Sequence, residues 1–187
     1  MPEYVDRLDG GILGVVDELE REFEARLAES STLAFRVAFG VLRHRQDAED
    51  VAQEAFVKAY RRFTQLRDRD RFRAWLVRMT WRMAIDRQRA DRRRAARELV
   101  HATPAPMTDA AEDIAARERT EQLWRAIDTL PDKLRLVVIL AGIQEHDMGE
   151  VARLLRVPEG TVKSRLFLAR RRLKEQLQWV IANPATR

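Results

Sequence analysis

The sequence of 187 residues contains no cysteine and only three histidines. Without cysteine the chain forms neither a disulfide nor a thiolate zinc site. His44, His101 and His146 are too far apart in the sequence to suggest a metal cluster. We therefore expect a protein that uses no metal and no other cofactor.

The residues of a nucleophilic enzyme are also scarce. Serine occurs only at Ser30, Ser31 and Ser164, and no histidine lies near any of them in the sequence. A glycine-rich loop that would cradle a phosphate is missing. An enzyme such as a recombinase with a C-terminal helix-turn-helix is therefore disfavoured, and we expect no catalytic residue.

Long apolar runs are absent as well. The longest, residues 136–143, is too short to span a bilayer. The N-terminus also lacks the basic start of a secretory signal. We expect a cytoplasmic protein that makes no contact with a membrane.

Helix-breaking residues are few in the first half of the chain. Residues 3–103 contain no proline, and glycine occurs there at four positions only. Helical spacing of apolar residues predicts a helix over residues 48–63 with Asp47 as its N-cap, and its buried stripe comprises Val51, Ala52, Ala55, Phe56, Ala59, Tyr60 and Phe63. Upstream, residues 23–42 predict one or two buried helices.

A further helix is predicted from about Arg71 into an arginine-rich tail, after a charged connector at residues 64–70. One face of this helix carries Phe72, Trp75, Leu76, Met79 and Met83. Trp81 lies on another face, where it either stacks on an unpaired base or packs against the upstream helices, and packing is the favoured interpretation.

Prolines, small residues and acids change the character of the chain after residue 100, which is typical of a linker. Helical periodicity then resumes, and Pro131 opens a helix that runs to Ile143. The sequence thus predicts an all-α protein with two small helical domains joined by a linker. We expect an extension of unknown role at residues 1–20 (a flexible tail or a regulatory appendage), domains at 21–98 and 118–180, a linker at 99–117 and a tail at 181–187.

The second domain has the spacing of a helix-turn-helix: a helix at residues 147–155, a turn at 156–158 and a helix at 159–178. In the last helix, Val162, Leu166, Ala169 and Leu173 fall within one narrow arc and are predicted to be buried. The opposite arc is small, polar and basic at its N-terminal end, which suits the major groove of DNA. The alternative is a solvated amphipathic helix.

Positive charge is concentrated in two places. The net charge is +5, residues 67–97 hold twelve arginines against four aspartates, and residues 163–174 hold six basic residues and no acid. Such density indicates phosphate contact, as an alternative to simple solvation of helix ends.

Four segments, Asp-Ala-Glu-Asp-Val-Ala-Gln-Glu-Ala-Phe (47–56), Phe-Arg-Ala-Trp-Leu (72–76), Ala-Ile-Asp-Arg (84–87) and Gly-Thr-Val-Lys-Ser-Arg-Leu (160–166), resemble motifs of the extracytoplasmic-function group of bacterial sigma factors, in the same order. The resemblance spans about residues 23–177. It implies a transcription initiation factor that binds the beta and beta-prime subunits of core RNA polymerase and promoter DNA, with an anti-sigma factor as a possible further partner.

The resemblance also implies three sets of binding residues. The first, an acidic face that would otherwise be solvated surface, binds core polymerase and comprises Asp50, Gln53, Glu54, Val57 and Arg61. The second binds the melted minus-ten element and comprises Arg67, Arg69, Arg71, Arg73, Arg78, Arg82, Arg87, Arg89, Arg92 and Arg93. The third binds the minus-thirty-five element and comprises Thr161, Lys163, Ser164, Arg165, Phe167, Leu168 and Arg171.

Two positions depart from the pattern that the resemblance implies: Arg82 stands where asparagine is usual, and Leu168 where a basic residue is frequent. Both bear on the promoter sequence that is recognised. Phe167 and Leu168 are expected to be exposed, either toward a thymine methyl or toward polymerase or an inhibitor. A helix-turn-helix regulator that binds DNA alone is the competing function, and the arginine-rich N-terminal half argues against it.

Overall fold

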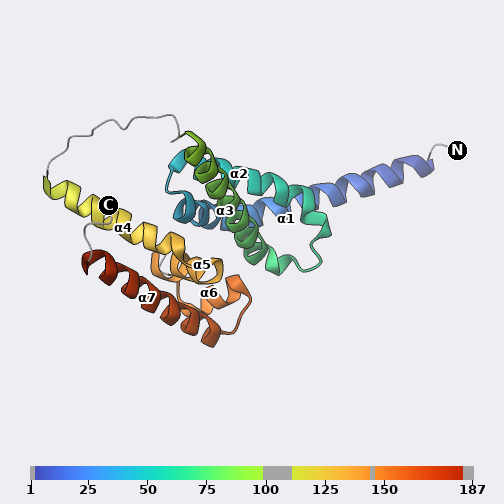
Figure 1. The fold of residues 1–187 in the computed structure, drawn as a ribbon. Helices are drawn as coiled ribbons and strands as arrows, with labels where there is room; N and C mark the ends of the chain where they lie inside the picture. The colour runs from blue at the N-terminus through green and yellow to red at the C-terminus, as the bar shows by residue number, and fades with distance from the viewer. Residues whose placement is uncertain (1–2, 99–110, 144–145, 183–187) are drawn as a thin grey trace. The chain divides into compact units, whose positions relative to one another are not determined.

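The computed structural model describes residues 3–98, 111–143 and 146–182 (Figure 1). Every regular element within these residues is a helix, so the predicted all-α class is confirmed. The chain divides into two compact units, Met1–Gln88 and Arg89–Arg187, as expected for two domains. The division lies within a helix, whereas the sequence placed the domain boundary at residue 98. Residues 99–110 of the predicted linker and 183–187 of the predicted tail lie outside the described residues.

The first part of the chain folds into three long helices and two short 3-10 turns. These are α1 (Glu3–Leu42), α2 (Arg45–Arg62), η1 (Phe63–Gln65), η2 (Arg69–Arg71) and α3 (Phe72–Glu98). Because α1 is one continuous helix from Glu3, the predicted extension at residues 1–20 is helical from that residue on. Arg43, with a φ of 56°, closes α1 by donating its backbone N–H to the Phe39 carbonyl at 2.8 Å.

The start of α2 differs from the prediction. The N-cap is His44, whose side chain accepts a hydrogen bond from the Asp47 backbone N–H at 3.4 Å. Asp47, the predicted cap, is already inside the helix, and its carboxylate accepts a hydrogen bond from Arg87 of α3 at 2.8 Å. The helix therefore begins three residues earlier than the apolar periodicity indicated, because a distant arginine engages the acid and a histidine takes over the cap.

Three phenylalanines form the centre of the N-terminal core. Phe23 of α1, Phe63 of η1 and Phe72 of α3 meet edge to face, with ring centroids 5.2–5.8 Å apart. Ala55 and Ala59 of α2 are fully buried beside them, since small side chains let α1 and α2 approach closely. Each aromatic pair contributes about 0.5–1.5 kcal/mol beyond its buried area.

Helix α3 is buried on more than the predicted face. Phe72 and Leu76 are buried as expected, but Trp75, Met79 and Met83 are only partly buried. A second stripe is enclosed instead, comprising Ala74, Val77, Trp81, Ala84, Ile85 and Gln88. The Gln88 amide donates to the Val41 carbonyl at 2.9 Å, so the end of α1 lies along this stripe. Trp81 is 8% exposed, which confirms the packing interpretation over base stacking.

The C-terminal unit contains α4 (Ala111–Thr129), α5 (Asp132–Val137), a π-helical segment η3 (Val138–Ile143), α6 (Met148–Leu155) and α7 (Glu159–Ala182). Helix α4 begins inside the range predicted as linker, and α7 ends inside the predicted tail. Pro131 is the N-cap of α5, and its carbonyl accepts the Leu134 backbone N–H at 2.8 Å. Helix α7 packs against α4, α5 and α6.

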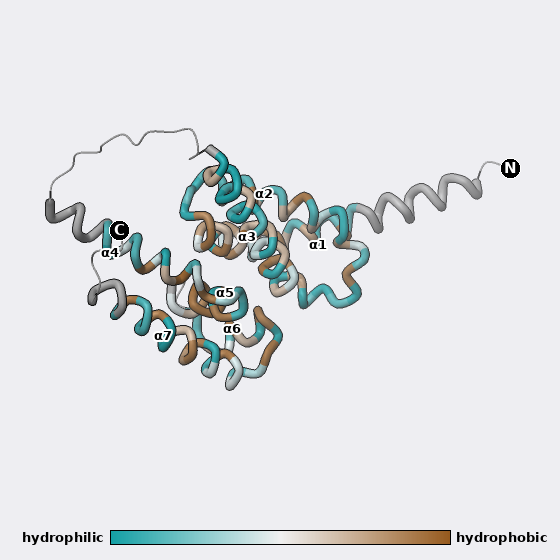
Figure 2. Tube along the Cα trace, in the orientation of Figure 1, coloured by the Kyte–Doolittle hydropathy of each residue, from teal (hydrophilic) through white to brown (hydrophobic). Residues whose placement is uncertain are grey.

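The apolar run at residues 136–143 supplies part of the core of this unit. Its residues from Leu136 to Leu140 are buried, and Figure 2 shows the hydrophobic segment where α5 lies. Asp128 of α4 and Arg135 of α5 form an ion pair at 2.6 Å in which both side chains are less than 10% exposed. The sequence did not predict this pair. Within the described residues no helix has the length and apolarity needed to cross a membrane.

Candidate polymerase-binding and DNA-binding surfaces

The exposed face of α2 carries all five residues predicted to bind polymerase. Val51, Ala55 and Ala59 are buried on the opposite face, as their spacing predicted. Val57 is 51% exposed although it is aliphatic, and Glu54 pairs with Lys58 at 2.7 Å along the helix. The face combines carboxylates with an exposed apolar side chain.

Tyr60 extends this face, although the sequence placed it in the buried stripe. It is 50% exposed: its ring lies edge-on to Phe23, with centroids 5.2 Å apart, and its hydroxyl donates to Glu20 of α1 at 2.9 Å. The hydrogen bond to Glu20, together with the charge of that residue, raises the pKa of Tyr60. Helical spacing cannot separate a tyrosine that packs with its ring edge from one that is enclosed.

The ten arginines predicted to bind the minus-ten element lie along the connector and α3. Arg69 and Arg78 are half-buried and the other eight are exposed. Helix α3 has 27 residues, about 40 Å of helix, so the arginines are spread along its length and around it and form no compact cluster. Arg87 is held by Asp47, and Arg71 pairs with Asp68.

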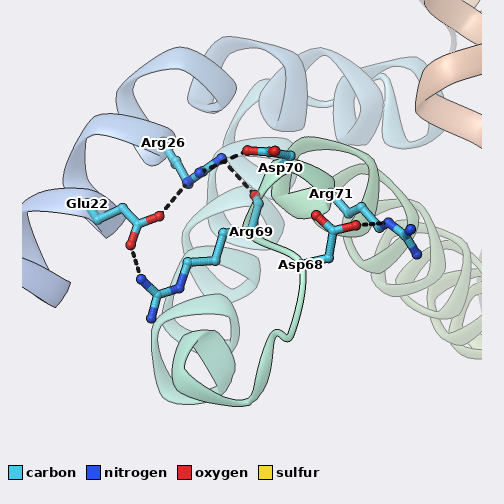
Figure 3. Close-up of polar contacts among 6 residues, drawn as sticks. All are labelled: Glu22, Arg26, Asp68, Arg69, Asp70 and Arg71. Carbon is cyan, nitrogen blue, oxygen red and sulfur yellow. Dashed lines mark hydrogen bonds and ion pairs between the residues drawn. The ribbon is translucent and has the colours of Figure 1, made fainter.

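The connector between α2 and α3 is tied to α1 (Figure 3). Arg26 donates to the backbone carbonyl of Arg69 at 2.7 Å and to the Asp70 carboxylate at 3.2 Å. Glu22, one turn before Arg26, accepts hydrogen bonds from Arg26 and from the Arg69 side chain. Sequence reasoning missed this arrangement: the spacing of Glu22 and Arg26 indicates only a pair within a helix, not its partners more than 40 residues away.

The predicted helix-turn-helix is confirmed in α6 and α7. The Asp147 carboxylate caps α6 by accepting the Glu150 backbone N–H at 2.7 Å. In the turn, Arg156 adopts the left-handed conformation with φ 57°, and Val157 donates its backbone N–H to the Ala152 carbonyl at 3.1 Å. The turn fixes the direction in which α7 leaves α6.

The outward face of α7 is mostly as predicted. The buried stripe contains Val162, Leu166 and Ala169, whereas Leu173, predicted to be buried with them, is half-buried. Opposite it, Lys163, Ser164, Phe167 and Arg171 are exposed, and Thr161 and Arg165 lie half-buried at the edges. Phe167 is 70% exposed.

Leu168 was predicted to be exposed, but it is half-buried. It follows the exposed Phe167 and precedes the buried Ala169, so it lies at the edge of the outward face. Lys163 pairs with Glu159 at 2.7 Å along the helix, and the Ser164 hydroxyl donates to the Thr161 carbonyl at 3.1 Å.

Comparison with known families assigns both units. Residues 27–94 match Sigma-70 region 2, and residues 120–173 match Sigma-70, region 4. The ECF RNA polymerase sigma factor SigW of Bacillus subtilis is 31% identical over 77% of this chain and 82% of its own length. This chain belongs to the extracytoplasmic-function (ECF) sigma factors of the sigma-70 family.

Other relatives agree. The ECF RNA polymerase sigma-E factor of Escherichia coli is 32% identical over 72% of this sigma factor and 76% of its own length. The RNA polymerase sigma-H factor of Pseudomonas aeruginosa is 34% identical over 71% and 74% of the two chains.

Solved structures share the fold of the sigma factor. The sigma factor RpoE of Bartonella quintana, in complex with the anti-sigma factor NepR, is similar at a TM-score of 0.55 and 21% identity, over 84% of this chain and 98% of that one. CnrH, in complex with the cytosolic domain of CnrY, is similar at a TM-score of 0.56 and 24% identity, over 85% and 89%.

Membership of the ECF sigma factors defines the activity of this protein. The sigma factor is a transcription initiation factor and not an enzyme: it binds core RNA polymerase and directs it to promoter DNA. The α2 face and the connector lie within the region 2 match, and α6 with most of α7 lies within the region 4 match. It acts where polymerase acts, in the cell interior.

Proposed function

We propose that this sigma factor divides its work among three surfaces. The α2 face binds the beta-prime and beta subunits of polymerase, the connector and α3 hold the melted minus-ten element, and α7 reads the minus-thirty-five element. The observation that carries the proposal is the contrast between the exposed face of α2, which presents Asp50 and Glu54, and the connector and α3, where eight of the ten predicted arginines are exposed.

The α2 face suits a protein partner. Asp50 and Glu54 repel the phosphates of DNA, and the exposed Val57 and Tyr60 supply the apolar contact found at the centre of protein interfaces. Charge complementarity with a basic surface of polymerase then gives specificity and a high association rate.

The connector and α3 suit a melted strand. Arginines spread over about 40 Å can follow a phosphate backbone, and their planar guanidinium groups bind phosphate bidentately. Arg82, the departure from the family pattern, adds one more exposed cation to this helix. The connector, at the start of α3, receives an extruded base.

Helix α7 suits the major groove. Lys163, exposed in its first turns, is positioned to donate a hydrogen bond to guanine, and Phe167 presents an apolar surface to a thymine methyl. Thr161, Ser164, Arg165 and Arg171 contact phosphates and neighbouring base edges. Leu168 contributes apolar contact from the edge of this face, where a basic residue is frequent in the family.

We propose further that the protein works in the cytoplasm, where promoter DNA and polymerase meet. We also propose an anti-sigma factor as a regulatory partner. Two solved structures that share its fold at a TM-score above 0.5 are complexes, one with an anti-sigma factor and one with a cytosolic domain.

Run-off transcription with core polymerase tests the proposal that the α2 face binds polymerase. Replacing Asp50→Lys and Glu54→Lys together should abolish association with core and with it transcription, because reversed charges at an interface cost several kcal/mol. Helicity should not change, because both side chains are exposed.

The matched control reverses two exposed glutamates on α1, Glu18→Lys and Glu29→Lys. It makes the same change in net charge and should retain core binding. Equal pull-down of core by the wild type and the Asp50/Glu54 variant would overturn the assignment of the α2 face.

A further inference from the structure

We propose that Arg26 of α1, together with Glu22, is a positioning residue for minus-ten recognition: it fixes the connector in the conformation that binds the promoter base. The inference rests on the proposed role of the connector. It adds α1, which touches no DNA in that proposal, to the parts of the protein that determine minus-ten preference.

A single guanidinium connects three acceptors. Arg26 donates through Nη1 to the Arg69 carbonyl at 2.7 Å, through Nη2 to Asp70 at 3.2 Å and through Nε to Glu22 at 3.1 Å (Figure 3). The Arg26 side chain is only 27% exposed, so these contacts are less screened than those of a fully exposed pair. The planar fork of arginine matches such a divergent set of oxygens, whereas a lysine ammonium does not.

Glu22 makes a second contact with Arg69 of the connector. One carboxylate oxygen accepts from Arg26 and the other from the Arg69 side chain. The Arg69 guanidinium also lies over the Phe63 ring, 5.3 Å from its centroid. Residue 69 is thus held by its backbone through Arg26 and by its side chain through Glu22. This clamp makes Arg69 a structural group, in contrast to its predicted role as a phosphate contact.

The connector has little other support. It consists of two three-residue 3-10 turns, η1 and η2, and neither has a side-chain hydrogen bond at its N-cap. Short 3-10 turns have poor hydrogen-bond geometry and are weak by themselves. Among the residues between Phe63 and Phe72, none is fully buried, although Leu66 packs against the core cluster. Beside that apolar contact, the polar contacts from α1 hold the segment in its shape.

Charge on the clamp is permanent. Burial lowers the pKa of Arg26, but hydrogen bonds and charges from Glu22 and Asp70 outweigh that effect, and the pKa is raised overall. The guanidinium therefore stays protonated wherever the protein is folded.

Hydrogen exchange and promoter selection together test the proposal. In the free protein, Arg26→Ala should speed amide exchange at residues 66–71 by about tenfold or more, since hydrogen bonds to charged groups are lost. Arg26→Lys should restore part of the protection. In polymerase holoenzyme, Arg26→Ala should relax base preference in a randomised minus-ten element and leave minus-thirty-five preference unchanged. A general loss of folding would weaken both elements alike.

The matched control is Arg21→Ala, which removes an arginine from the same helix whose ion pair, with Asp17, stays within α1. It should change neither measurement. If the Arg26→Ala variant loses helicity, the Asp70→Ala variant is used in its place. The Asp70 side chain is 93% exposed, and its removal breaks the ion pair with Arg26.

A direct variant of the connector, Gln65→Ala with Arg67→Ala, separates the two proposals. If it changes minus-ten preference and Arg26→Ala does not, the positioning role is wrong and the proposed function of the connector stands. If neither changes it, the proposed function of the connector is wrong and the positioning role falls with it. Faster exchange with unchanged minus-ten preference in Arg26→Ala would also overturn the positioning role.

Discussion

Ion pairs in two regions of the molecule differ in how far they reach along the chain. Around the connector and the start of α2 they join distant elements: Arg69 with Glu22, Arg26 with Asp70 and Arg87 with Asp47 are 40 to 47 residues apart. On the outward face of α7, Lys163 pairs with Glu159 and Arg171 with Glu175, each four residues along the same helix. The first kind fixes tertiary structure. The second contributes only about 0.3–0.5 kcal/mol and exchanges readily for DNA.

The difference teaches that cations of similar appearance serve different purposes. In the N-terminal unit several arginines position the segments around them. On α7 the scaffold is the apolar stripe of Val162, Leu166 and Ala169, and the cations are available for a ligand.

Two phenylalanines give the largest expected contrast between the units. Phe72 is 1% exposed in the N-terminal core and Phe167 is 70% exposed on α7. Phe72→Ala should lower the free energy of unfolding by about 3–5 kcal/mol, whereas Phe167→Ala should change it by about 0.5 kcal/mol or less. Urea denaturation followed by circular dichroism measures both. Equal destabilisation would mean that Phe167 is part of a core.

The arginines at the end of α3 sharpen the comparison, because they are predicted to bind DNA although two of them also pair with distant acids, Arg89 with Asp132 at 3.3 Å and Arg92 with Asp128 at 2.5 Å. Replacing Arg89, Arg92 and Arg93 together by alanine should reduce the slope of log affinity against log salt by about two to three units, at about 0.7–0.9 per phosphate contact. Promoter binding by holoenzyme at several salt concentrations gives the slope. The control replaces three exposed arginines elsewhere, Arg21, Arg36 and Arg119, and an equal effect of both triple variants would refute the assignment.

Replacing Lys163 tests whether the ion pairs on α7 leave their cations free to bind DNA. Lys163→Ala should cost about 1–3 kcal/mol at one base pair of the minus-thirty-five element and leave stability almost unchanged, because its pair with Glu159 is exposed. Binding to a panel of single-base promoter variants locates the base pair. A uniform loss over all variants would show that Lys163 contacts phosphate instead.

The smallest expected effect concerns Tyr60 and Glu20, a tertiary contact at the surface. The hydrogen bond from the Tyr60 hydroxyl to Glu20 raises the pKa of Tyr60, so its contribution to stability is complete below the unfolded pKa of about 10 and disappears as pH rises through the higher folded value. Glu20→Gln should lower the ionisation midpoint of Tyr60. Absorbance at 295 nm in a Tyr4→Phe background, where Tyr60 is the sole tyrosine, measures it; an unchanged midpoint would contradict the contact.

Much of the fold follows from local patterns. Apolar spacing predicted α2, the start of α3 and both helices of the helix-turn-helix, because each buries one stripe that the sequence itself displays. The motifs at residues 47–56 and 160–166 predicted the family. The outward residues of α2 and α7 followed from the same periodicity.

What the sequence did not predict depends on partners far along the chain. The cap at His44, the exposed position of Tyr60, the buried Asp128–Arg135 pair and the second buried stripe of α3 each arise from a neighbouring element. The clamp around Arg69 is the clearest case, since Glu22, Arg26 and Asp70 all look like ordinary surface charges in the sequence. Periodicity reports which face is apolar, not which charged side chains meet.

The separation of promoter reading between the two units is tested most directly by selection from promoters in which both elements are randomised. Holoenzyme with the connector variant Gln65→Ala and Arg67→Ala should alter the selected minus-ten sequences alone. Holoenzyme with Lys163→Ala should alter the selected minus-thirty-five sequences alone. The result that would contradict the account is a shift of the same element by both variants, or selected sequences identical to those of the wild type for both.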